Sequence, residues 1–397
     1  MIIDADTHLF EPRDLWVTHT PSRQRDLALS IDTDALGYPW LTRRGQPFPG
    51  MVAWVGAPGD FAHLGDLRER ARRGLPNVVA PYDEMPRDYC DPDARVARLD
   101  EWGVDEAVLF PQWGFMWESL VADDLETTRV NCAAWNRWSV EVAQSGRGRL
   151  HPVGHVSLQG DAEWVCEQLA VLSAGGVRLA MMSPGLVNGQ RLSHPDNDPI
   201  WRSFVEHEIS PAWHVNNQMM AFVDGYQAWF GDDHDSNHKA VLGLFQPVAV
   251  QLGLADLAVN GVFERFPDLV IVLAEVGADW FAPLAVRADV NYEVCRLING
   301  RPVNPSLTRR PSELLHEHTT IICSFPSDAT PGLVSRYPGT FCFGSDYPHP
   351  EGLADPVRGY AALLGELDGE VAATMYGGNI ARLLHGVDVA RAPTPPT

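Results

Sequence analysis

Residues 150–184, LHPVGHVSLQGDAEWVCEQLAVLSAGGVRLAMMSP, decide the fold of this chain. Two short apolar runs, 150–158 and 177–184, flank a segment, 161–174, in which apolar residues recur with the period of an α-helix. Short apolar runs joined through an amphipathic helix predict two parallel strands with a crossover connection. This unit therefore predicts an α/β protein with a parallel sheet.

The same alternation of strand and helix extends in both directions along the chain. Apolar runs predict eight strands, at residues 1–8, 104–111, 150–158, 177–184, 209–215, 269–277, 319–326 and 340–348. Eight such strands favour a closed (β/α)₈ TIM barrel over an open doubly wound sheet, because no strand end carries the glycine-rich phosphate loop that is typical of the latter.

A barrel of this type needs about 250 residues, so much of the 397-residue chain must lie outside the repeating units. We assign residues 1–385 to a single barrel and residues 386–397 to a flexible tail. The surplus is predicted to form three insertions, at 12–92, 217–247 and 297–318. The first contains a predicted hairpin over 27–48 that turns near Gly37 and Gly45. If each insertion follows a strand, all three cover the carboxyl-end face, where active sites of this fold lie.

The charge balance excludes several classes of partner. The chain has 30 Lys and Arg residues against 52 Asp and Glu residues, a formal net charge of −22. Such a charge repels phosphate backbones and anionic lipid surfaces, so we expect neither nucleic acid nor a membrane as a partner. The six cysteines are scattered and the first residues show no leader-like pattern, which predicts reduced thiols and a cytoplasmic location.

Polar side chains at the carboxyl ends of the predicted strands indicate a metal site. Asp4, Asp6 and His8 end the first strand, and a period of two places all three on the same side. His214 ends the fifth strand and Asp346 ends the eighth. These ends converge in a closed barrel, and carboxylate and imidazole groups suit Zn²⁺, Mn²⁺ or Fe²⁺. The predicted ligands of one divalent metal are Asp6, His8, His214 and Asp346.

Each of these residues also has a simpler interpretation. A lone histidine at a strand end is commonly a hydrogen-bonded structural residue, and we prefer that interpretation for His151, His155 and His194. Asp346 follows Gly-Ser and could cap the next helix. The joint occurrence of four such residues at three strand ends favours the metal site.

Four segments resemble the amidohydrolase superfamily. They are DADTHLFEP (4–12), DPIWRSFVEHEISPAWHV (198–215), GVFERFPDLVIVLAEVGADWFAPLAVRADVNYE (261–293) and FGSDYPHPEG (343–352). The resemblance is to the amidohydrolase-2 branch, which contains aminocarboxymuconate-semialdehyde decarboxylase and related metal-dependent aromatic-acid decarboxylases. It implies the same four metal ligands as the strand ends do.

Two departures from the pattern of that family bear on the metal. The usual H-x-H pair of the first strand is Asp6-x-His8 here, and the added negative charge favours a harder metal, Mn²⁺ or Fe²⁺, beside Zn²⁺. The fourth strand ends without the lysine that bridges two metals in dinuclear members, which argues for one metal. Glu275 stands where many members have a sixth-strand histidine, and its carboxylate could bind a second metal.

A metal at this position could activate water or hold an oxygen of the substrate. In a hydrolase, Asp346 would take a proton from water, and Glu275 or His349 would pass one to the leaving group. In a nonoxidative decarboxylase, a proton delivered to a ring carbon would precede loss of CO₂. The sequence leaves both open, together with a non-haem diiron, iron or manganese oxygenase on the same barrel, or a subunit of one.

Further residues are expected around the metal. Glu11 could be a ligand, could support one, or could simply begin the next helix. Arg13 and Arg178 are candidate clamps for a substrate carboxylate. An aromatic pocket is predicted from Trp113, Trp117, Phe325 and Tyr347. The expected substrate is a small aromatic or unsaturated carboxylic acid, and the family resemblance implies a homodimer or a complex with a paralogous subunit.

Overall fold

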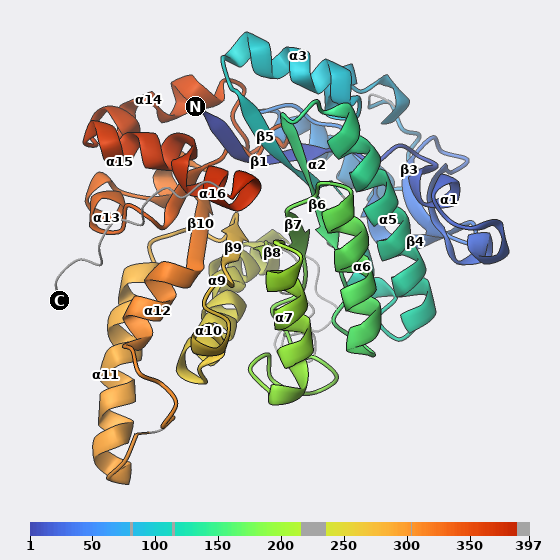
Figure 1. Ribbon diagram of the computed structural model, residues 1–397. Coiled ribbons are helices and arrows are strands. Elements are labelled where there is room, and N and C mark those ends of the chain that lie inside the picture. The colour runs from blue at the N-terminus through green and yellow to red at the C-terminus, as the bar shows by residue number, and fades with distance from the viewer. Residues whose placement is uncertain (80–81, 113–115, 216–235, 303, 387–397) are drawn as a thin grey trace.

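The computed structural model describes residues 1–79, 82–112, 116–215, 236–302 and 304–386. Eight strands form one sheet in chain order (Figure 1). They are β1 (Ile3–Leu9), β5 (Glu106–Pro111), β6 (Leu150–His155), β7 (Leu179–Met181), β8 (Ser210–His214), β9 (Ile271–Ala274), β10 (Thr319–Cys323) and β11 (Phe341–Phe343). Each overlaps one of the eight predicted runs, so the predicted (β/α)₈ barrel is confirmed.

The barrel closes between its first and last strands. Successive strands from β1 to β11 pair in parallel. The chain just beyond β11 then returns to β1, where Thr7 forms a parallel bridge with Tyr347. The backbone N–H of His8 donates to the carbonyl of Tyr347 at 2.7 Å, and that of Asp346 donates to the carbonyl of Asp6 at 2.8 Å. Closure therefore brings the end of β1 against the segment that follows β11.

Helices surround the strands (Figure 1). They are α3 (Pro92–Trp102), α5 (Leu125–Ser145), α6 (Ala162–Ala174), α7 (Asp198–Glu206), α9 (Ser236–Val259), α10 (Val262–Arg265), α11 (Phe281–Asn299), α12 (Pro311–His318), α13 (Pro331–Arg336), α14 (Pro356–Gly365), α15 (Gly369–Ala373) and α16 (Asn379–His385). Asp91, Asp124 and Asp161 each accept a hydrogen bond from the backbone three residues on, which fixes where α3, α5 and α6 begin. Among the described helices, none has both the length and the apolar run that crossing a bilayer requires.

Strand β1 departs from strict alternation. Its register with β5 shifts after Asp4, so that three steps along β1 oppose two steps along β5. Asp4 pairs with Ala107, which packs among residues of the surrounding helices, whereas His8 pairs with Phe110, which packs inside the barrel. The prediction that Asp4 shares a side with Asp6 and His8 is therefore wrong for Asp4, because the bulge turns the later residues inward.

Residues 12–92, which we call the cap, form a substructure after β1. It contains α1 (Leu15–Thr18), α2 (Phe61–Arg72) and a three-stranded antiparallel sheet of β2 (Leu29–Thr33), β3 (Pro39–Arg43) and β4 (Gln46–Val52). Arg44 and Gly45 join β3 to β4 with φ of 52° and 70°, as a two-residue hairpin turn requires. The backbone N–H of Gly59 donates to the carbonyl of Pro350 at 2.7 Å, which places the cap over the carboxyl ends of the strands.

Of the other two predicted insertions, the structure describes only the end of the second and nearly all of the third. Residues 217–235 of the second insertion, and residues 387–397 of the predicted tail, lie outside the described part of the chain. Residues 297–318 span the end of α11, a connection and α12, which leads directly into β10. In that connection, Asn304 donates Nδ2–H to the carbonyl of Val259 at the end of α9. The expectation that this segment covers the carboxyl-end face is therefore wrong, because a segment that runs from a helix into a strand lies at the amino end of the barrel.

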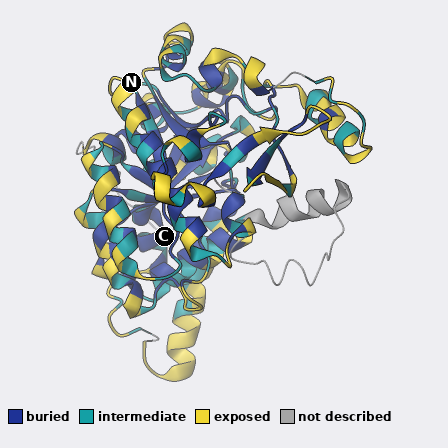
Figure 2. Ribbon diagram, turned by 90° about the vertical axis from the view of Figure 1, so that its right-hand side faces the viewer, coloured by how far each residue is buried: buried dark blue, intermediate teal, exposed yellow. Residues whose placement is uncertain are grey.

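The apolar core has an inner and an outer layer. Side chains inside the barrel, among them Val153, Leu179 and Val272, form one cluster, and larger clusters fill the space between strands and helices. Figure 2 shows the buried strands enclosed by helices with exposed outer faces. Helix α11 projects away from the barrel (Figure 1), and Leu297 and Ile298 near its end are exposed. The middle of the inner layer is apolar, and buried polar side chains gather at the carboxyl end of the barrel.

Candidate metal centre

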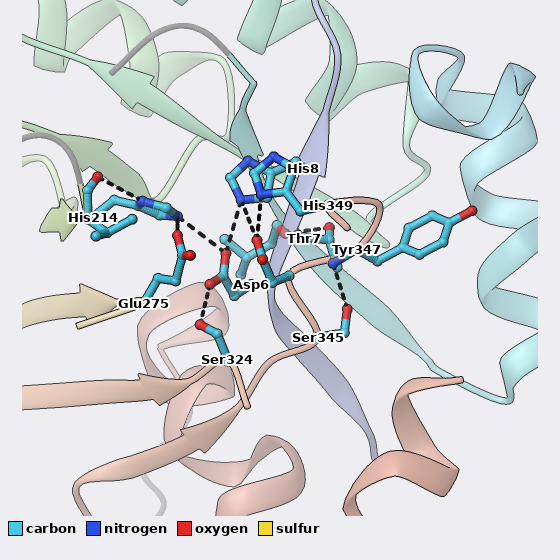
Figure 3. A network of polar contacts seen from close by, with 12 residues as sticks. Asp6, Thr7, His8, His214, Glu275, Ser324, Ser345, Tyr347 and His349 are labelled. Atoms are coloured by element: carbon cyan, nitrogen blue, oxygen red, sulfur yellow. Dashed lines mark hydrogen bonds and ion pairs between the residues drawn. The ribbon is translucent and has the colours of Figure 1, made fainter. Parts of the chain in front are cut away.

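Four buried side chains from β1, β8 and the segment after β11 meet at the carboxyl end of the barrel (Figure 3). Nε2 of His8 lies 3.1 Å from Oδ1 of Asp346 and 3.7 Å from Oδ1 of Asp6. Nε2 of His214 lies 3.7 Å from the same oxygen of Asp6. The four residues predicted as metal ligands therefore lie together around one point.

Each of three predicted ligands is oriented by a hydrogen bond on the side away from this point. Nδ1 of His8 lies 3.0 Å from the carbonyl of Pro111, and Nδ1 of His214 lies 3.1 Å from the carbonyl of Val215. Because a carbonyl only accepts, Nδ1 carries the proton in both rings, and Nε2 presents its lone pair to the centre. The hydroxyl of Ser324 donates to Oδ2 of Asp6 at 2.5 Å, which leaves Oδ1 directed at the centre.

The donor set fits a divalent metal. The potential ligand atoms of Asp6, His8 and His214 lie within 4.8 Å of one another, as do those of His8, Asp346 and His349. Oδ1 of Asp6 and Oδ2 of Asp346 are buried, yet neither accepts a hydrogen bond from any described residue. Buried carboxylate oxygens in this state are costly unless a cation compensates them. Carboxylate oxygen with imidazole nitrogen suits Zn²⁺, Mn²⁺ or Fe²⁺.

The electrostatics of the cluster also favour a bound cation. Burial, and then the charge of Asp6, raises the pKa of Asp346 well above its ordinary value. Burial, and then the charge of Asp346, does the same to the pKa of Glu275. Oxygens of Glu275, Asp346 and Glu351 lie within 4.8 Å of one another. A cation here would relieve the repulsion among these carboxylates.

Glu275 and Asp346 share a backbone conformation that is strained for residues other than glycine. Their φ angles are 56° and 55°. Residues held in this region tend to occur where the surrounding structure fixes a functional side chain. Glu275 directly follows β9 and places Oε2 3.8 Å from Nε2 of His214, so the turn at its backbone aims the carboxylate at the centre.

His349 joins the centre to the cap. Its Nδ1 lies 2.8 Å from Oδ1 of Asp346, and its Nε2 lies 2.7 Å from Oε1 of Gln112. The ring stacks on His8 with centroids 3.8 Å apart, and the ring of Trp54 in the cap lies 5.4 Å away. Burial lowers the pKa of His349. Its neutral imidazole is therefore placed to exchange a proton with Asp346.

Three further predicted residues occupy different positions around the barrel mouth. Glu11 is fully buried beyond β1, and its carbonyl accepts the hydroxyl of Tyr82 at 2.8 Å. Among the described residues, no cluster of three potential metal ligands includes Glu11. Trp117, the first residue of α4 (Trp117–Leu120), is fully buried with its ring 5.2 Å from that of His155. Phe325 is half-buried just beyond β10. Trp113 lies outside the described residues.

Neither predicted arginine clamp faces the centre. Arg178 immediately precedes β7, at the end of the barrel away from the metal ligands, and lies 3.9 Å from Glu208. The prediction for Arg178 is wrong, because a residue before a strand lies at the amino end. Arg13 is held within the cap, where Nε pairs with Asp83 at 2.5 Å and Nη1 donates to the carbonyl of Ile31.

Tyr347 turns away from the centre, contrary to its predicted place in the pocket. Its hydroxyl donates to Oδ2 of Asp88 at 2.6 Å, and its ring packs against Tyr89 and Trp102. Figure 3 shows the ring directed away from Asp6. Because Asp346 points inward, the alternation of side chains sends the next residue outward.

Two further polar residues lie at the barrel mouth: His155, for which the sequence favours a hydrogen-bonded structural role, and Gln112, which was not predicted from the sequence. His155, the last residue of β6, pairs in register with Met181, whose side chain lies inside the barrel. Its Nε2 lies 2.7 Å from Oε2 of the buried Glu118. Gln112, which binds His349, follows β5 directly. The rule that identified His214, a polar residue at a strand end, applies to both.

The fold of this chain is similar to that of several solved structures. No family model matches the chain, and a search of curated proteins finds no match. An amidohydrolase from Mycobacterium avium subsp. paratuberculosis K-10 has a TM-score of 0.77 at 24% identity, over 98% of each chain. A 5-carboxyvanillate decarboxylase from Novosphingobium aromaticivorans DSM 12444 with bound manganese has a TM-score of 0.61 at 16% identity, over 97% of each chain.

A third solved structure, a 2,6-dihydroxybenzoate decarboxylase from Rhizobium, has a TM-score of 0.59 at 14% identity, over 96% of this chain and 98% of that one. The chain therefore has the fold of these amidohydrolase and decarboxylase structures, along nearly its whole length.

Proposed function

We propose that this chain is a divalent-metal-dependent enzyme of the amidohydrolase superfamily that decarboxylates a small aromatic or unsaturated carboxylic acid without oxidation. The observation that carries the proposal is the convergence of two carboxylates and two imidazoles at the carboxyl end of a closed barrel. The proposed ligands are Asp6, His8, His214 and Asp346. Zn²⁺, Mn²⁺ and Fe²⁺ all suit this set, and the bound manganese in a structure of the same fold supports Mn²⁺.

When bound, such a metal supplies Lewis-acid polarisation of substrate oxygens. The residues of the chain supply the proton. We propose that Asp346, whose pKa burial raises in the metal-free chain, delivers a proton to the ring carbon that bears the carboxylate. The bond between that carbon and the carboxylate then breaks, its electron pair restores the ring, and CO₂ leaves. His349, 2.8 Å from Asp346, returns a proton from the rim.

The choice of decarboxylation over hydrolysis rests on the neighbouring folds and on the apolar surroundings. Two structures of this fold act on aromatic acids, as their names state. Trp117 and Phe325 are proposed to contribute apolar surface to the substrate pocket, with Glu11 and Glu275 supporting the metal ligands. Hydrolysis by the same residues, with Asp346 taking a proton from water and Glu275 or His349 protonating the leaving group, is the alternative within this class.

A second candidate is an oxygenase with two metals. It is favoured by one observation, the grouping of carboxylate oxygens from Glu275, Asp346 and Glu351 within 4.8 Å. Carboxylates bridging two iron or manganese ions would suit oxygen chemistry. This candidate requires two metal ions per chain and consumption of O₂ with a reductant.

The deciding experiment is metal analysis of protein purified without chelator, together with CO₂ release from a panel of hydroxybenzoates. We expect release of CO₂ without uptake of O₂, and we expect Asp346→Asn to lose turnover together with one equivalent of Mn or Zn relative to the unmodified chain. Two irons per chain with uptake of O₂ would favour the oxygenase. Turnover that persists after removal of all metal would overturn both candidates.

A further inference from the structure

A second cluster of potential metal ligands lies at the opposite end of the barrel. Glu106 is the first residue of β5, His151 the second of β6 and His385 the last of α16, which crosses that end of the barrel in Figure 1. Pro111, the residue that orients His8, lies five positions after Glu106 on β5, a distance of about 16 Å along the strand. The two clusters are therefore independent.

The three side chains converge on a single atom. Nε2 of His151 and Nε2 of His385 each lie 2.7 Å from the same oxygen, Oε2 of Glu106. The two rings meet at 77° with their centroids 5.4 Å apart, so both nitrogens face one point from different directions. Two hydrogen bonds alone would not require both nitrogens to face the same oxygen of Glu106, because a carboxylate offers a separate oxygen to each donor.

The cluster carries charge and is open to solvent. Burial raises the pKa of Glu106, but the hydrogen bonds from His151 and His385 outweigh burial and lower it, so the carboxylate is ionised. The side chain of His385 is 32% exposed, whereas those of His151 and Glu106 are 12% and 13% exposed. An ion can therefore enter from the side of α16, and water can complete its coordination.

We propose that Glu106, His151 and His385 bind a divalent metal ion of the zinc type at the amino end of the barrel. Two imidazole nitrogens and one carboxylate oxygen are a common ligand set for Zn²⁺, with a fourth position left for water. Around a tetrahedral ion these donors would stand about 3.3 Å apart, so small rotations of the side chains suffice. The bound ion would tie the end of α16 to the first residues of β5 and β6.

The test is the number of zinc ions bound per full-length chain, measured after equilibrium dialysis against Zn²⁺. His385→Gln removes one ligand, and Glu106→Gln removes the charge while retaining an oxygen that accepts hydrogen bonds. His194→Gln is the matched control, since His194 lies 3.5 Å from a single carboxylate, that of Asp196. We expect the first two variants to bind one equivalent less than the unmodified chain, and the control to bind the same amount.

A second measurement compares the unmodified chain with and without Zn²⁺, with His385→Gln as its control. Zn²⁺ should slow amide hydrogen exchange in residues 379–385 of the unmodified chain, and should have no such effect in His385→Gln. Equal zinc content in all four proteins, or exchange in α16 that does not respond to Zn²⁺, would overturn the proposal and leave a purely hydrogen-bonded cluster. Because the readout is a difference of one equivalent, it holds whether or not the centre at the carboxyl end binds a metal.

Discussion

Glu275 and Asp346 have nearly the same left-handed φ, 56° and 55°, and bring carboxylate oxygens to within 4.8 Å of each other. The residues that follow two different strands thus have the same strained backbone conformation, and their carboxylates lie close together. A left-handed φ costs a side-chain-bearing residue about 1–2 kcal/mol, which glycine avoids. We expect Glu275→Gly to have a free energy of unfolding about 1 kcal/mol greater than that of Glu275→Ala, measured by urea denaturation of metal-free protein. Equal values for the two variants would mean that the surroundings relax and the position is not strained.

Asp346→Asn should lower metal affinity without lowering the stability of the metal-free fold. Asparagine tolerates the left-handed conformation, and removing a buried negative charge costs the metal-free protein little. We therefore expect the melting temperature without metal to be retained or raised. Mutation of a residue that hydrogen-bonds to a metal ligand lowers metal affinity by up to roughly 100-fold. Loss of a direct ligand should lower the affinity for Mn²⁺ or Zn²⁺ by at least as much, as measured by titration calorimetry. Unchanged affinity with an intact fold would remove Asp346 from the ligand set.

Ser324→Ala tests whether Asp6 is positioned by its hydrogen bond. Without the donor at 2.5 Å, the carboxylate is free to rotate, and metal affinity should fall by roughly 10- to 100-fold. Ser139→Ala is the control, because Ser139 is equally buried but lies on α5 away from the centre. A similar loss of affinity in both variants would point to a general effect of removing a buried hydroxyl.

The buried pair of Glu118 and His155 should matter for stability. Glu118→Ala leaves His155 buried beside an apolar side chain, and we expect a loss of about 3 kcal/mol in the free energy of unfolding. Glu118→Gln keeps an acceptor for Nε2–H and should lose less than about 1 kcal/mol. If denaturant titration gives the same value for both variants, the contact contributes packing rather than a charged hydrogen bond.

Asp328 should make stability depend on pH. Burial raises the pKa of its carboxyl group from 3.8 to about 6. The folded chain then holds this proton more tightly than the unfolded chain does, so stability falls as the pH rises from about 4 to about 6 and is level on either side. The amplitude is at most about 3 kcal/mol, and less because the side chain is only half-buried. Asp328→Asn should reduce the slope of melting temperature against pH in this window, and an unchanged slope would contradict the assignment.

Much of the barrel and of the centre could be predicted from the sequence, because both rest on local patterns. Apolar runs mark each strand. A polar residue at the end of such a run is costly to bury, so it either has a functional role or forms hydrogen bonds that offset the cost of burial. His214 and Asp346 follow this rule, and the structure brings them together with Asp6 and His8. The same rule, applied without preference for metal ligands, also identifies His155.

The remainder depends on details that periodicity does not encode. The bulge in β1 shifts the register after Asp4, and no single residue type marks it. The predicted strand 177–184 already places Arg178 near its amino end, and the observed β7 begins only at Leu179, so the position of Arg178 along the strand excludes it from the carboxyl-end face. Tyr347 and Asp346 are neighbours in sequence yet face opposite sides, so the inward direction of one fixes the outward direction of the other.

Closure of the barrel by the segment after β11 sets the order in which the centre can be assembled during synthesis. Asp6 and His8 leave the ribosome first, but Asp346 is translated 340 residues later, about half a minute at roughly 10 residues per second. Until then the nascent chain carries an incomplete set of ligands and an open barrel edge. The four proposed ligands can therefore meet only after Asp346 has been translated and the segment after β11 pairs with β1.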